Sequence, residues 1–165
     1  MISRERQANV AWILAAAMLL NMFIATYIEL QELSISTGSA SITGDTCFTN
    51  STTAGAGGCF QVQSSQYSSL FGVSIAGWGM IIFMFMTVAM GSFAMSIKKN
   101  KPIPFYEQAH FRRLLFLAFF AAVLFALWFI YAQLFLIQAI CRYCTALDII
   151  TVISAIVFFI TFKRD

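Results

Sequence analysis

Charged residues are scarce in this sequence. Only 10% of its 165 residues are Asp, Glu, Lys or Arg, whereas 60% are hydrophobic, and the mean hydropathy is +0.81. A soluble globular domain carries about a quarter charged residues, so this composition excludes that class and indicates a membrane protein. The few basic residues lie at the ends of apolar segments, and they form no block of the kind that binds nucleic acid.

Candidate metal ligands are also few. The chain has one histidine, His110, and four cysteines, Cys47, Cys59, Cys141 and Cys144. A C-x-x-C pair such as Cys141–Cys144 is often half of a zinc site in soluble proteins, but zinc requires two further ligands. The other two cysteines have eleven residues between them, and the histidine lies in a basic loop. We therefore expect no metal.

Long apolar runs dominate the rest of the chain. Each run is long enough to cross about 30 Å of hydrocarbon. The runs are continuous and rich in Phe, whereas a transmembrane β-barrel would show short alternating strands. The first run is too long for the apolar part of a signal peptide. The sequence predicts one all-α integral membrane domain over residues 1–165, a four-helix bundle with helices over residues 10–28, 75–97, 114–137 and 144–162.

Residues 29–74 have a different composition. They are rich in Ser, Thr and Gly, contain no Lys or Arg, and include Cys47 and Cys59. A glycine-rich stretch, residues 54–58, leads directly into Cys59. The segment is either an outer loop held by a structural disulfide or the carrier of a mobile cysteine pair, and the loop alone favours neither interpretation. We expect a short interfacial helix over residues 60–71.

The basic residues predict the orientation of the bundle, because they collect on the inner side of a membrane. With four spans, both chain ends and the loop over residues 98–113 fall on one side. Both cysteine pairs then fall on the other, outer side, where Arg142 is the exception to the rule. The inner side holds nine of the ten basic residues, which are Arg4, Arg6, Lys98, Lys99, Lys101, Arg112, Arg113, Lys163 and Arg164.

The pair Cys141–Cys144 stands at the start of the last predicted helix. The unpaired backbone N–H groups and the dipole at a helix start favour a thiolate. Two cysteine pairs on one face suggest a relay, in which a thiolate attacks a disulfide through a mixed disulfide. Electrons that leave a thiol pair inside a bilayer need a lipid-soluble acceptor, and quinones are the common one.

The order of these motifs resembles that of the vitamin K epoxide reductase family. DsbB-type membrane oxidoreductases have the opposite order, with the membrane C-x-x-C before the loop pair. The resemblance covers residues 47–162 and rests on Cys47, the run Cys59-x-x-Val62-x-x-Ser65, Phe71-Gly72, Gly79 and Cys141-x-x-Cys144.

The resemblance implies a four-helix bundle around a quinone pocket. Cys144 would face the quinone, Cys141 would exchange with Cys59, and Cys47 would take electrons from a thioredoxin-like partner. No thioredoxin-like domain follows Asp165 in this sequence, so we expect the partner to be a separate protein. The resemblance also leads us to expect a bacterial or archaeal type of member, in a prokaryotic plasma membrane with the cysteines on the outer face.

Three positions are candidate quinone contacts by the same resemblance. Ser65 matches the serine of the loop motif. Family members commonly carry Asn four residues before the glycine that matches Gly79, where this chain has Ile75. The animal enzymes carry Tyr one turn after the second C-x-x-C cysteine, where this chain has Asp148. These two departures favour quinone-coupled disulfide formation over epoxide reduction.

Asp148 has two interpretations. An ionisable residue inside a membrane helix is a functional candidate, and in its protonated form it would donate a hydrogen bond to a quinone carbonyl. The run Thr145-x-x-Asp148 also fits a capping box at a helix start. Asn21, in the first apolar run, and Gln138, just after the third, are weaker candidates for function, and we expect interhelical hydrogen bonds at both positions.

Two functions remain for the whole chain. One is a non-enzymatic four-helix scaffold of the claudin or tetraspanin kind, whose outer-loop cysteines only cross-link the fold. A scaffold has no need of a C-x-x-C pair at a helix start. We therefore predict an enzyme, a membrane thiol–disulfide oxidoreductase that passes electrons from a thioredoxin-like partner through Cys47 and Cys59 to Cys141 and Cys144 and then to a quinone.

Overall fold

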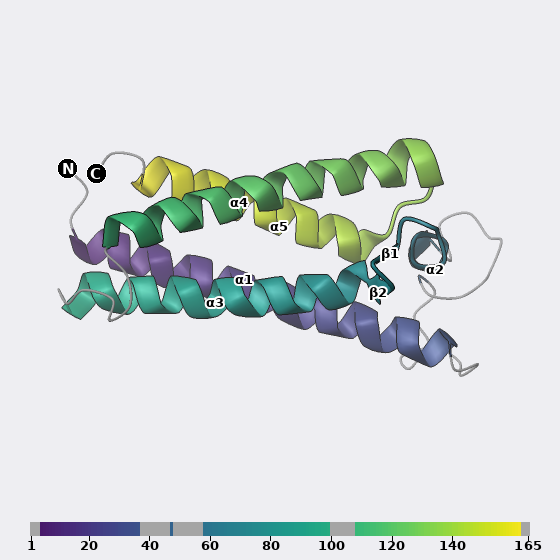
Figure 1. The fold of residues 1–165 in the computed structure, drawn as a ribbon, viewed down its shortest axis with the longest axis horizontal. Helices are drawn as coiled ribbons and strands as arrows, with labels where there is room; N and C mark the ends of the chain where they lie inside the picture. Colours follow the sequence, from purple (N-terminus) through teal and green to yellow (C-terminus); the bar gives the residue numbers. More distant parts are fainter. Residues whose placement is uncertain (1–3, 37–46, 48–57, 100–107, 163–165) are drawn as a thin grey trace.

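The computed structural model describes residues 4–36, 47, 58–99 and 108–162. Within them, four long helices lie side by side as a bundle (Figure 1). Helix α1 packs against α3 and α5, and α4 packs against α5. All four are long and apolar enough to cross a membrane, which confirms the predicted all-α membrane fold. Their bounds are Arg4–Ser36 for α1, Ile75–Lys99 for α3, Gln108–Tyr131 for α4 and Arg142–Phe162 for α5.

Helix α1 is longer than predicted, because it continues two turns beyond Ile28 to Ser36. Ile28 and Gln31 are buried three residues apart on one face, and this packing carries the helix past the end of the apolar run. At the same end of the bundle, α4 passes without a break into a π-helical segment, η2, over Ala132–Ile137 (Figure 1). Helix α5 then begins at Arg142, two residues before the predicted start.

The short helix predicted over residues 60–71 is replaced by a shorter helix and a hairpin. Helix α2 spans Gly58–Gln63, strand β1 spans Ser69–Leu70 and strand β2 spans Val73–Ser74. Phe71 and Gly72 join the antiparallel strands with φ angles of 55° and 79°. Two consecutive positive φ angles are typical of the tight turn that fits the twist of a two-residue hairpin.

Ser74 fixes the start of α3 against α1. Its Oγ accepts a hydrogen bond from the backbone N–H of Gly77 at 2.9 Å and donates one to the carboxylate of Glu29. An N-cap serine of this kind satisfies one of the backbone donors that a helix start leaves open. The backbone N–H of Ile75 donates to the carbonyl of Ser68 at 2.8 Å, so the hairpin is also held to the helix start.

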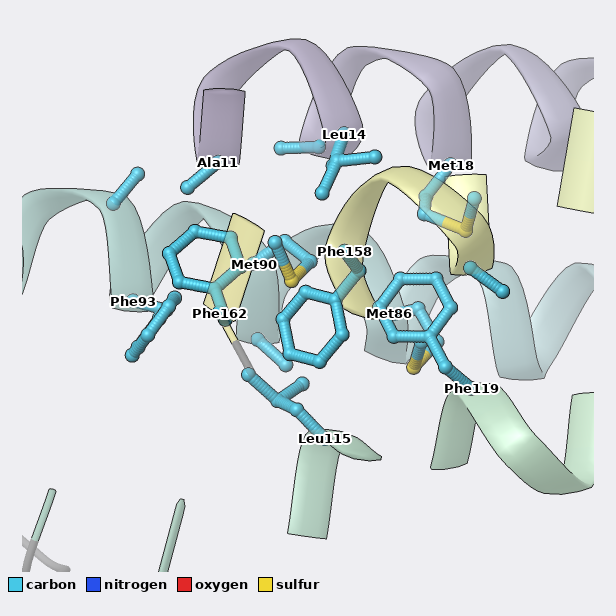
Figure 2. Close-up of a cluster of buried hydrophobic side chains, with 14 residues drawn as sticks. Ala11, Leu14, Met18, Met86, Met90, Phe93, Leu115, Phe119, Phe158 and Phe162 are labelled. Atoms are coloured by element: carbon cyan, nitrogen blue, oxygen red, sulfur yellow. The ribbon is translucent and has the colours of Figure 1, made fainter. Parts of the chain in front are cut away.

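The interior of the bundle consists of two apolar clusters. One lies toward the start of α1 and the end of α5, and it packs Phe and Met side chains from all four long helices (Figure 2). The rings of Phe119 and Phe158 stack there with centroids 4.7 Å apart. The second cluster lies at the opposite end and contains the cysteines. We call it the redox cluster, and its buried members are Ile28, Cys47, Cys59, Val62, Ala76, Phe129, Ala139, Cys141 and Cys144.

Candidate redox site

Both cysteine pairs belong to the redox cluster, although Cys59 and Cys141 are 82 positions apart in the chain. Cys47 and Cys59 form a disulfide with Cα atoms 5.1 Å apart, whereas Cys141 and Cys144 are free thiols. All four side chains are buried. Helix α2, which carries Cys59, lies at the same end of the bundle as the start of α5 (Figure 1). The fold therefore brings a disulfide and a dithiol together at one end of the bundle.

Cys141 is the N-cap residue of α5. Its Sγ accepts a hydrogen bond from the backbone N–H of Cys144 at 3.4 Å, as the side-chain oxygen of an N-cap serine would. The pKa of Cys141 lies below its ordinary value, first because the Cys144 side chain hydrogen-bonds to its sulfur, and next because backbone N–H groups do so. Burial acts in the opposite direction but has the smaller effect. Cys141 is thus the sulfur better able to carry negative charge as attacking or leaving group.

The capping-box interpretation of Asp148 is wrong. Helix α5 begins at Arg142, so Thr145 lies inside the first turn, where its Oγ donates to the carbonyl of Cys141 at 3.0 Å. Asp148 lies one turn beyond Cys144 on the buried face of α5 and is 9% exposed. Among the described residues, its buried Oδ2 has no hydrogen-bond partner.

Asn21 forms the predicted interhelical hydrogen bond. Its Nδ2 donates to Thr151 Oγ1 at 3.0 Å and to the carbonyl of Leu147 at 3.5 Å, which ties α1 to α5. Its Oδ1 is buried and has no partner within the part of the chain that the structure describes. Leu147 and Thr151 flank Asp148 in the sequence of α5. The interface between α1 and α5 therefore contains polar atoms beyond Cys144 in an otherwise apolar bundle.

Gln133 is a site residue that the sequence reasoning missed. It lies in η2 and is 2% exposed. Its Oε1 accepts a hydrogen bond from the backbone N–H of Cys141 at 3.0 Å. The available signal was an uncharged polar residue inside an apolar run, eight positions before the C-x-x-C motif. Polar residues buried in membrane helices generally serve packing or function, so this position could have been selected.

Ser65 and Ile75 both contact the redox cluster, Ser65 through a hydrogen bond and Ile75 through apolar packing. Ser65 lies two residues after the end of α2, and its Oγ donates to the carbonyl of Val62 at 2.7 Å. Ile75 is the first residue of α3 and packs against the redox cluster. Their contacts with a quinone, like that of Asp148, stay predictions. The glycine-rich residues 54–57 lie outside the described part of the chain.

Gly58 makes a close backbone contact with the segment before the C-x-x-C motif. A Cβ atom added at Gly58 would lie 2.5 Å from the carbonyl oxygen of Ile140, which is backbone and cannot rotate away. We expect Gly58→Ala to lower the free energy of unfolding by about 1–3 kcal/mol, the usual effect of overpacking. Gly91→Ala is the matched control, because the nearest atom to a Cβ added there is Trp12 Cζ3 at 4.0 Å, an ordinary van der Waals distance.

Thermal unfolding in one detergent checks this prediction. The Tm of Gly58→Ala should fall, whereas that of Gly91→Ala should stay or rise, since Ala favours a helix interior over Gly. Equal Tm values for the two variants would contradict the close contact between α2 and the segment before α5.

The fold and the site define a multi-pass membrane protein with two cysteine pairs in one buried cluster. The model of the vitamin K epoxide reductase family matches residues 11–161 of the chain. The match covers nearly the whole sequence, so the chain belongs to this family of oxidoreductases, and the resemblance seen in the sequence is confirmed. Neither the curated proteins nor the solved structures give a match.

Proposed function

We propose that the protein is a membrane thiol–disulfide oxidoreductase that transfers electrons from a thioredoxin-like partner to a quinone, generating disulfides in the process. The observation that carries this proposal is the burial of both cysteine pairs in the redox cluster, one as a disulfide and the other as a dithiol. Exchange between the pairs needs no external reagent, because one pair is reduced as the other is oxidised.

The first step is reduction of the loop pair. A dithiol of the partner reduces the Cys47–Cys59 disulfide through a mixed disulfide with Cys47 and leaves as a disulfide. Cys59 then attacks the sulfur of Cys141 in an oxidised Cys141–Cys144 pair. The new Cys59–Cys141 bond forms while the old bond breaks, and Cys144 leaves as a thiolate that takes up a proton.

The second step returns the loop pair to the oxidised state. The Cys47 thiolate attacks Cys59, the Cys47–Cys59 disulfide forms again, and Cys141 leaves as a thiolate. The lowered pKa of Cys141 favours this step, because a thiol of lower pKa is the better leaving group. A loop disulfide beside a free inner dithiol is the state that follows this exchange.

The residues beyond Cys144 fit a quinone as the electron acceptor. A buried polar atom without a partner is rare in proteins, and such an atom calls for a specific explanation. Among the described residues, Asp148 Oδ2 and Asn21 Oδ1 are two such atoms. Asp148 lies one turn beyond Cys144 on α5, and Asn21 lies where α1 is hydrogen-bonded to α5. A bound quinone accepts two electrons and two protons from the dithiol. Asp148 would hold a quinone carbonyl by a hydrogen bond, and Ser65 and Ile75 would line the same pocket.

Oxidation of a thioredoxin-like protein tests the proposal. The purified chain should oxidise a reduced thioredoxin-like protein only when a quinone is added, and the amount of hydroquinone formed should equal the amount of partner disulfide. Cys47→Ala is the matched control. It should stop oxidation of the partner, while the Cys141–Cys144 dithiol of the same variant still reduces the quinone. Partner oxidation without hydroquinone would refute the link to the quinone.

The orientation is tested by thiol labelling in intact cells. A cysteine at Ser64, an exposed residue just after α2, should react with an impermeant thiol reagent added outside, because the distribution of basic residues predicts that this end is outside. A cysteine at Lys99, the last residue of α3, should react only after the membrane is opened. The unmodified chain gives the background labelling of the native thiols. Labelling of Lys99→Cys by the reagent added outside would contradict the proposed orientation.

A further inference from the structure

The peptide unit that joins Ile140 to Cys141 is held from two sides. Its N–H donates to Gln133 Oε1 at 3.0 Å, on the side of η2. Its carbonyl oxygen faces Gly58 so closely that a Cβ atom there would lie 2.5 Å away. Gly58 directly precedes Cys59, and this peptide unit contains the backbone nitrogen of Cys141. One backbone unit therefore fixes the spacing between the segment that carries the loop disulfide and the segment that carries the inner dithiol.

Gln133 controls the course of the chain over this whole segment. Its backbone carbonyl accepts the N–H of Ala139 at 3.1 Å, in a turn where Gln138 has a left-handed conformation with φ 56°. Its side-chain oxygen then accepts the N–H of Cys141. The residue is 2% exposed, so these contacts are shielded from bulk solvent. The end of η2 and the start of α5 are thus joined through one glutamine.

We propose that Gln133 is a positioning residue for the thiol exchange between Cys59 and Cys141. This inference rests on the proposed function. Thiol–disulfide exchange requires the attacking sulfur to lie in line with the bond that breaks, so a small displacement of Cys141 slows the exchange. Gln133 holds the backbone N–H of Cys141 by its hydrogen bond. Gly58, the residue before Cys59, contacts the same peptide unit from the other side.

A trapped exchange measures this effect without a quinone or a partner. With Cys144→Ser, the Cys141 thiolate attacks the Cys47–Cys59 disulfide, the Cys59–Cys141 disulfide forms and Cys47 leaves as a thiolate. The reaction conserves one disulfide and one thiol, so no oxidant is needed. Rapid alkylation followed by peptide mapping gives the rate at which the Cys59–Cys141 disulfide appears and its final ratio to Cys47–Cys59.

Three substitutions in this background separate positioning from folding. Gln133→Met has a similar length but no acceptor, and it should slow the exchange about 10-fold or more, as expected from a misplaced reacting group. Gln133→Glu keeps the acceptor oxygen and replaces only Nε2, which has no partner among the residues described, so it should restore most of the rate. Leu134→Met introduces the same side chain at the next, exposed position and should leave the rate unchanged.

The outcomes distinguish the inference from the proposed function. An unchanged exchange rate in Gln133→Met, or a rate that Gln133→Glu does not restore while its Tm equals that of the parent, would overturn the positioning role and leave the relay intact. Absence of any Cys59–Cys141 disulfide in the parent Cys144→Ser chain would instead overturn the order of the relay. Loss of exchange in Gln133→Met and recovery in Gln133→Glu would establish the role.

Discussion

Replacing Cys144 by serine should stop turnover and let the Cys59–Cys141 mixed disulfide accumulate beside the Cys47–Cys59 disulfide. Without the Cys144 sulfur, the inner pair cannot form its own disulfide, so it cannot pass electrons on to the quinone. Only Cys47 can release Cys141 from Cys59, and this exchange re-forms the Cys47–Cys59 disulfide. Loss of a group that takes part directly in bond making usually costs on the order of a thousandfold or more in rate. We therefore expect quinone reduction to fall to the background level.

The pH dependence of this trapped exchange should differ between two substitutions at the same position. The Cys144 side chain makes the largest contribution to the lowered pKa of Cys141 by hydrogen bonding to its sulfur. Cys144→Ala removes that donor, so the pKa of Cys141 should rise toward its ordinary value. Cys144→Ser keeps an O–H donor. Since the thiolate is the attacking form, exchange in Cys144→Ala should begin at a higher pH than exchange in Cys144→Ser.

Peptide mapping after alkylation, over a series of pH values, measures both effects. The control is Cys141→Ser, which removes the attacking sulfur and should leave only the Cys47–Cys59 disulfide at every pH. Identical pH profiles for the serine and alanine variants would contradict the assigned cause of the lowered pKa. Substantial quinone reduction by Cys144→Ser would contradict the role of Cys144 itself.

The membrane fold could be predicted from the sequence because its signals are local. Each span is a continuous apolar run. Because lipid offers no hydrogen-bond partners, the backbone groups of such a run must pair with one another, and an α-helix achieves this within one segment. The ends of the spans were less predictable, because packing decides them. Ile28 and Gln31 carry α1 two turns past its apolar run, and that burial depends on contacts with other parts of the fold.

The cysteines of the site could also be selected from the sequence, but their surroundings could not. The order and spacing of the motifs indicated two pairs at one end of a bundle. The contact of Gly58 with Ile140 and the hydrogen bond from Cys141 to Gln133 join segments through tertiary structure and a π-helical turn. No periodic pattern in the sequence encodes such a turn. The start of α5 was misplaced for a related reason, because a cysteine acts as the N-cap in place of the usual Ser, Thr, Asp or Asn.

Replacing Asp148 by leucine should weaken the use of quinone and leave the exchange between the cysteine pairs intact. Asp148 lies one turn beyond Cys144 on the buried face of α5, and its Oδ2 has no partner among the residues described. A hydrogen bond to a neutral ligand contributes about 0.5–1.5 kcal/mol, so the quinone KM should rise roughly 2- to 12-fold. The rate of Cys59–Cys141 exchange should change little, because the charge of Asp148 has only the smallest of the effects that act on the pKa of Cys141.

Asp148→Asn is the matched control for this prediction. Its amide keeps a hydrogen-bond donor at the same place, so its quinone KM should stay near that of the unmodified chain, while the dependence of KM on pH should become weaker. Quinone KM values for the two variants, measured in one detergent across a series of pH values, decide the matter. If Asp148→Leu has an unchanged KM and only a lower Tm, the carboxyl group supports the α1–α5 interface and does not contact the quinone.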